Sequence, residues 1–297
     1  MLNKSPKLNS LSLISQQGRG WSLDVAPLLL SSFRPSTLRS LVLQGVACNL
    51  SIENFESDNR QIAEYFLSLV ELEELQLGGS IGRRNLELRM LMKDTLREGE
   101  REMLFPKLRR FEGTSTNLLW LLDDVGSSPI DTITINELEP IDEMEFTSLL
   151  NKLPSSLISA EITFARYDPL RPSVQDAILR MSSTCPRLQD LTISTVSSLR
   201  FSARSMTRIS VPSSFSLTIR SVALLPYLSS LRLPPTTVCG IEGDVSIAVA
   251  DLFKECEHLL RVDFAGAEQD GRDAALEATR WERRCTKEGD LIAVRIG

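Results

Sequence analysis

The chain has 297 residues, 42% of them hydrophobic, and its 33 basic and 39 acidic residues leave a formal charge of −6. This mildly acidic balance argues against nucleic acid or an anionic membrane as a partner. No segment approaches the roughly 18 consecutive apolar residues that a membrane span needs, and the first residues lack the pattern of a signal peptide. We therefore expect a soluble intracellular protein, cytoplasmic or nuclear.

A short phrase, leucine-x-x-leucine-x-leucine and its variants, recurs along the whole chain. Its nine copies begin at Leu8, Leu38, Leu72, Leu108, Ile130, Leu157, Leu188, Leu228 and Leu259. The phrase is typical of a leucine-rich repeat, a strand and a helix that cannot bury their apolar faces alone. The copies begin 22 to 40 residues apart, which leaves room for a helix in most repeats. The sequence predicts an α/β leucine-rich-repeat solenoid, an irregular horseshoe with a parallel concave sheet and helices on the convex side.

Helices are expected in the gaps between the phrases. Apolar residues at helical spacing mark the segments 61–70, 174–181 and 245–257. The charged segment 93–102 mixes both signs at helical spacing and predicts the exposed face of a convex helix or an ordered insertion, with a partner site as the alternative. A proline shortly before the first leucine of a phrase ends the helix and starts the strand. Such prolines are Pro6, Pro106, Pro154, Pro186 and Pro226.

We expect one domain over residues 1–297, with the segment 266–297 as its C-terminal cap. A solenoid needs a cap because its last repeat would otherwise expose the apolar seam. The expected cap is a helix over 273–285, in which Leu276 and Trp281 cover the last repeat.

The five cysteines form an odd set without a close pair, which argues against disulfides and zinc sites. Cys185 and Cys256 occupy matching places, three residues before Leu188 and Leu259. We expect each to fill a small apolar slot where a helix turns into a strand, since free cysteine is among the most buried residue types.

Side chains alternate along a strand, so the leucines that point inward also define which residues point outward on the concave face. The outward residues are mostly small and neutral, with no stripe of basic residues and no aromatic ladder, which argues against inositol phosphates and nucleic acid. They form either a merely solvated sheet surface or a contact surface for a protein partner. The candidate contact residues are Glu74, Gln76, Arg110, Glu112, Thr132, Thr134, Ser159, Glu161, Asp190, Thr192, Arg232, Arg261 and Asp263.

No spacing in the chain predicts catalysis, a cofactor or a metal site. The only histidine, His258, stands at a helix-to-strand joint, and no nucleophile elbow or P-loop is present. The acidic segment 137–145 lacks the pattern of a calcium-binding EF-hand loop. Gly78, Gly79 and Gly82 predict a turn rather than a phosphate cradle. We expect a protein that is not an enzyme.

Four segments resemble the repeat region of fungal F-box proteins of mushroom-forming basidiomycetes. They are FPKLRRFEG at 105–113, LLWLL at 118–122, CPRLQDLTI at 185–193 and LPYLSSLRLP at 225–234. The segment 274–296, with Trp281 ahead of LIAVRI, is similar to the closing segment of that family. The resemblance implies repeats that select the substrate of a cullin-RING ubiquitin ligase, while an amino-terminal F-box docks the ligase adaptor. Here the first phrase begins at Leu8, so we expect the F-box to be missing and adaptor binding to be in doubt.

Three hypotheses follow for the function. The leading one is a non-catalytic protein-binding domain, related to the substrate receptors of ubiquitin ligases. The second is a free-standing scaffold or inhibitor with the same repeats. The third is a small-molecule sensor with a pocket beneath the long connection between Leu188 and Leu228.

Overall fold

The computed structural model describes two compact units of the chain, Met1–Asn136 and Glu137–Gly297. The expectation of one domain over 1–297 stays a prediction. The described residues are 8–15, 23–31, 34–50, 55–78, 88–92, 95–96, 99–100, 104–122, 129–136, 143–164, 174–195, 215–233, 245–264, 279–286 and 291–296.

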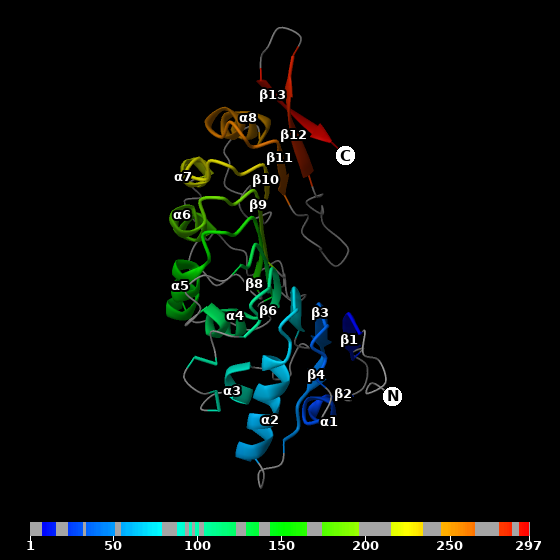
Figure 1. Cartoon of the computed structure of the whole chain (residues 1–297). Helices are drawn as coiled ribbons and strands as arrows, with labels where there is room; N and C mark the ends of the chain where they lie inside the picture. The colour runs from blue at the N-terminus through cyan, green and yellow to red at the C-terminus, as the bar shows by residue number, and fades with distance from the viewer. Residues whose placement is uncertain are drawn as a thin grey trace, which may run out of the picture. The chain divides into compact units, whose positions relative to one another are not determined.

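The first unit is a parallel sheet with helices on one side (Figure 1). Its strands pair with their neighbours in the order β1 Ser10–Ile14, β3 Ser40–Gln44, β5 Glu74–Gly78, β6 Arg110–Gly113 and β7 Thr132–Asn136. Its helices are α1 Ala26–Leu29, α2 Phe55–Leu67, α3 Leu88–Met92 and α4 Ser115–Leu122. Two short strands, β2 Leu23–Asp24 and β4 Val46–Ala47, form a separate parallel pair.

The second unit repeats this plan and ends differently. Its parallel strands are β8 Ser159–Phe164, β9 Asp190–Thr195, β10 Ser230–Leu233 and β11 Arg261–Phe264. Two antiparallel strands follow, β12 Thr279–Cys285 and β13 Leu291–Ile296. The helices are α5 Glu143–Lys152, α6 Val174–Thr184, α7 Phe215–Val222 and α8 Val245–Glu255, and each packs against the next.

The repeated phrase sets the register of the strands. Leu41 pairs with Leu75, which pairs with Phe111, so equivalent positions of the phrase stack across the sheet. These inward side chains are at most 1% exposed. Burying one such side chain stabilises the fold by roughly 1.5–3 kcal/mol. The predicted α/β leucine-rich-repeat architecture, with parallel strands on one side and helices on the other, is confirmed.

The helix-to-strand joints are built from the same type of turn. The backbone N–H of the first leucine of a phrase donates to the carbonyl three residues earlier, as Leu108 does to Phe105 at 3.0 Å and Leu188 to Cys185 at 3.1 Å. Pro106 and Pro186 therefore occupy the second position of this four-residue turn, where a fixed φ near −65° is favoured. As predicted, a helix ends before Pro154, Pro186 and Pro226, and a strand follows each of them. No helix is described directly before Pro106, and Pro6 lies outside the described residues.

The same turn explains the matching cysteines. Cys185 and Cys256 accept the turn hydrogen bond at their carbonyls, and their side chains are buried, as predicted. Burial raises the pKa of each thiol to about 11. At neutral pH both are protonated apolar fillers. Cys239 lies outside the described residues.

The prediction of a capping helix over 273–285 is wrong where the structure describes it. Thr279–Cys285 is the strand β12, which pairs antiparallel with β11 and places Trp281 opposite Val262. Trp281 is 8% exposed, so it covers the last repeat as expected, but from a strand. A period of two in the sequence, with Trp281 flanked by the charged Arg280 and Glu282, fits a strand better than a helix. Leu276 lies outside the described residues.

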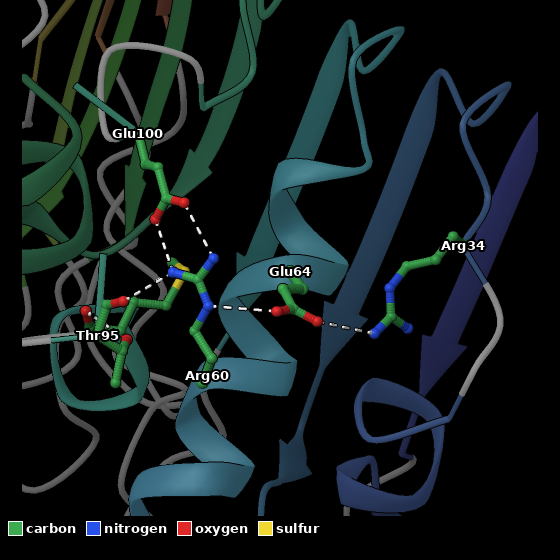
Figure 2. Close-up of polar contacts among 6 residues, drawn as sticks. Arg34, Arg60, Glu64, Thr95 and Glu100 are labelled. Carbon is green, nitrogen blue, oxygen red and sulfur yellow. Dashed lines mark hydrogen bonds and ion pairs between the residues drawn. The ribbon is translucent and has the colours of Figure 1, made fainter. Parts of the chain in front are cut away.

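On the helix side of the first unit, an ion-pair network holds Thr95 and Glu100 against α2 (Figure 2). The Arg60 guanidinium donates to both carboxylate oxygens of Glu100, at 2.7 and 2.9 Å, and to the carbonyl of Thr95 at 3.0 Å. The Glu64 carboxylate forms ion pairs with both Arg60, at 3.2 Å, and Arg34, at 3.9 Å. Residues 95, 96, 99 and 100 lie in turns and a bend, and the rest of the segment 93–102 lies outside the described residues, so its alternatives stay predictions.

Candidate functional site

The outward face of each unit comprises the strand side chains that point away from the helices. In the first unit, the register aligns Glu74, Arg110 and Thr132 in one row and Gln76, Glu112 and Thr134 in the next. All six predicted contact residues of this unit therefore lie together on three neighbouring strands.

Charged side chains of the first outward face have partners on neighbouring strands. Arg110 Nη1 lies 3.3 Å from Glu74 Oε1 on the adjacent strand. The Glu112 carboxylate accepts a hydrogen bond of 3.3 Å from the Asn136 side-chain amide. Such cross-strand pairs contribute roughly 0.2–1 kcal/mol each. The Arg110–Glu74 pair cancels two opposite charges, whereas the Asn136 amide is neutral and leaves the charge of Glu112 unchanged.

The second outward face carries two longer rows. One row aligns Ser159, Asp190, Ser230, Arg261 and Glu282. The next row aligns Glu161, Thr192, Arg232, Asp263 and Arg280. All seven contact residues predicted for this unit lie in these rows.

Asp263 corrects the sequence analysis, which placed it as an exposed contact residue. It is 7% exposed, and its carboxylate oxygens lie 3.1 Å from Arg280 Nε and 3.5 Å from Arg261 Nε. Asp263 therefore anchors two guanidinium groups and is not itself accessible to a partner. Sequence reasoning missed this because it read the segment that contains Arg280 as a helix.

Three outward side chains of β12 were missed for the same reason. Arg280, Glu282 and Arg284 alternate with the inward Trp281 and extend the second outward face by one strand. Arg284 pairs with Glu282 at 3.5 Å. The alternation around Trp281 was the available signal in the sequence.

Three charged groups on the second face are exposed and unpaired. Glu161 on β8, Asp190 on β9 and Arg232 on β10 have no ion pair or side-chain hydrogen bond among the interactions of the described residues. Arg232 is a diagonal neighbour of Asp190 and lies in the same row as Glu161, two strands away. The face is thus acidic over β8 and β9 and basic over β10 to β12.

The arrangement offers binding geometry but no reaction centre among the described residues. The ring of His258 stacks on that of Tyr227, with centroids 6.1 Å apart, and no nucleophile contact accompanies it in the described part of the chain. Within that part, no group of three histidine, cysteine or acidic residues is placed to hold a metal ion. The connection expected to cover a small-molecule pocket falls largely on 196–214, outside the described residues.

The repeated strand, turn and helix define the fold as that of a leucine-rich-repeat protein. No family model and no curated protein matches the chain. Among solved structures, the leucine-rich repeat-containing protein LegL7 from Legionella pneumophila matches with 12% identity over 86% of this chain and 83% of that chain, at a TM-score of 0.42. In the described residues, none of the helices has the length and apolar character required to cross a bilayer.

Proposed function

We propose that this chain is a non-catalytic protein-binding repeat domain that selects the substrate of a cullin-RING ubiquitin ligase. The observation that carries the binding role is the pair of outward faces. Parallel strands in register hold rows of polar side chains on a sheet whose backbone groups already bond one another. A rigid scaffold lowers the entropy that is lost when a partner binds.

The ligase role rests on the resemblance of the repeat segments to fungal F-box proteins. The segments 105–113 and 185–193 that carry it each hold a helix-to-strand turn followed by a strand with outward polar residues. In such receptors the repeats present the substrate, and a separate adaptor contact recruits the ligase. This role is therefore separable from protein binding and needs its own readout.

The experiment is an affinity purification of the tagged chain from its native cells, read by mass spectrometry. Beside the wild type we would use a face variant, Ser159→Arg with Thr192→Arg. The matched control is Asn151→Arg with Ser183→Arg, which adds the same charge at exposed positions on α5 and α6. We expect specific partners that are lost from the face variant and retained by the control.

The outcomes separate the two parts of the proposal. Recovery of cullin and adaptor subunits together with face-dependent partners supports the ligase role. Face-dependent partners without those subunits contradict the ligase role and favour a free-standing scaffold or inhibitor. Partners that bind the face variant and the control equally contradict binding through the outward face.

A further inference from the structure

We infer that the outward face of the second unit binds an extended peptide segment with separated charges, its basic residues over β8 and β9 and its acidic residues over β10 and β11. The inference rests on the proposed protein-binding function and specifies the chemistry of the partner. It comes from the placement of charges on this face, which the first unit does not share.

The acidic zone is made of Glu161 and Asp190. Ser159 pairs with Asp190 and Glu161 with Thr192, so the two carboxylates are diagonal neighbours on adjacent strands. Diagonal side chains in a sheet lie roughly 7–8 Å apart. Two unpaired carboxylates at this separation repel each other weakly, and a lysine or arginine of a partner placed between them would interact with both.

The basic zone is made of Arg232, Arg261 and Arg280, which surround Asp263. Arg232 and Arg280 belong to the two strands that flank β11 and align with Asp263 in the register. Beside them, Glu282 is paired with Arg284 at 3.5 Å, which leaves Asp263 against three guanidinium groups and a local excess of positive charge among the described residues. Arg261 and Arg280 are preorganised because Asp263 holds them, whereas exposed Arg232 has no ion pair among the described residues.

The spacing of the two zones sets the spacing in the peptide. Glu161 on β8 and Arg232 on β10 lie in one row and are separated by two strand intervals, about 10 Å. An extended peptide advances about 3.3 Å per residue, so its basic and acidic groups should be about three residues apart. Between the zones, the hydroxyl group of Thr192 offers a hydrogen bond to the peptide backbone, and the Ser230 hydroxyl, which accepts from Arg261 at 3.1 Å, can still donate one.

In the experiment, a phage-displayed library of random 12-residue peptides is selected for binding to the full chain. We expect enrichment of peptides that carry lysine or arginine about three residues from aspartate or glutamate, in either direction. A synthetic peptide with the enriched sequence is then compared with a scrambled peptide in which the charges alternate. We expect the scrambled peptide to bind at least tenfold more weakly than the enriched one. This difference in affinity should shrink at high salt, because salt screens exposed charges.

The matched variant is Glu161→Lys with Asp190→Lys and Arg232→Glu, which exchanges the zones on exposed side chains. It should bind the selected peptide at least tenfold more weakly than the wild type, while Asn151→Arg with Ser183→Arg binds it unchanged. If the triple variant does not fold, the single change Arg232→Gln tests whether the basic zone binds the peptide, and we expect about threefold weaker binding.

Enrichment without a charge pattern, no enrichment, or equal binding to the triple variant would each overturn the inference. These results leave the proposed function intact if the variant with Ser159→Arg and Thr192→Arg still loses the cellular partners that the wild type binds. Failure of that dependence removes the protein-binding proposal itself, whatever the peptide library selects. The two experiments therefore fail independently.

Discussion

The two units use the same repeat to build outward faces with different electrostatics. In the first unit, Glu74 is paired with Arg110 across neighbouring strands, and Glu112 is bonded to Asn136. In the second, Glu161, Asp190 and Arg232 stay exposed and the charges separate into two zones. The comparison teaches that the repeat phrase determines the backbone, while the residues between its leucines determine what the surface can bind.

The units also differ in what supports the repeats. The first has the Arg60–Glu100 ion pair on its helix side, and the second is covered by the β12–β13 hairpin. The hairpin buries the apolar surface of Trp281, whereas the ion pair joins groups that are 28% and 20% exposed. Hydrophobic burial should therefore contribute more to the second unit than the ion pair does to the first.

The largest expected effect comes from placing a charge among the inward leucines. Leu191→Asp buries a carboxylate at a position that is 1% exposed, and we expect a loss of about 4 kcal/mol or more in the free energy of unfolding. Urea denaturation measures the loss, and hydrogen exchange locates it. The adjacent outward change Asp190→Asn should be neutral. Unchanged stability of Leu191→Asp would mean that the strand register is wrong.

Removal of the cap residue should have the next largest effect. Trp281→Ala leaves a cavity over Val262, and we expect a loss of about 3 kcal/mol together with faster trypsin cleavage at Arg280 and Arg284. Trp281→Phe should lose much less, because the indole Nε1 has no hydrogen-bond partner. Equal losses from the two changes would contradict a mainly hydrophobic role.

The ion pair of the first unit should contribute less than the cap of the second. Glu100→Gln removes the charge that Arg60 binds through two hydrogen bonds, and we expect a loss of about 1 kcal/mol that shrinks at high salt. Thermal unfolding at two salt concentrations measures it. Glu64→Gln, at a more exposed carboxylate, should change stability by less than about 0.5 kcal/mol. A loss from Glu100→Gln as large as that from Trp281→Ala would reverse the comparison of the two supports.

The smallest effect on stability is expected on the outward face itself. Ser159→Arg and Thr192→Arg place long side chains on the side of the sheet away from the core, and stability should stay within about 0.5 kcal/mol of the wild type. Circular dichroism and thermal melting check this. Loss of folding from either change would show that these residues do not point outward.

Much of the fold follows from local sequence. The leucine phrase predicted the strands because its spacing alternates inward and outward residues, and it placed Leu75 and Leu191 in the core. The helix-to-strand joints were also predictable, since proline and cysteine recur at fixed positions before the first leucine. The strand period alone aligned the candidates in rows beside the inward leucines, but their contact with a partner stays a prediction.

Other features needed the tertiary structure because they depend on residues distant in the sequence. Asp263 looked like an exposed contact residue until β12 brought Arg280 beside it, 17 residues further along the chain. Arg60 and Glu100 are 40 residues apart, so no local pattern pairs them. The sequence by itself determined the repeat, the strand period and the buried leucines, since these depend on neighbouring residues. Only the tertiary structure decided which charges neutralise one another and which remain for a partner, because Coulomb energy depends on distance in space.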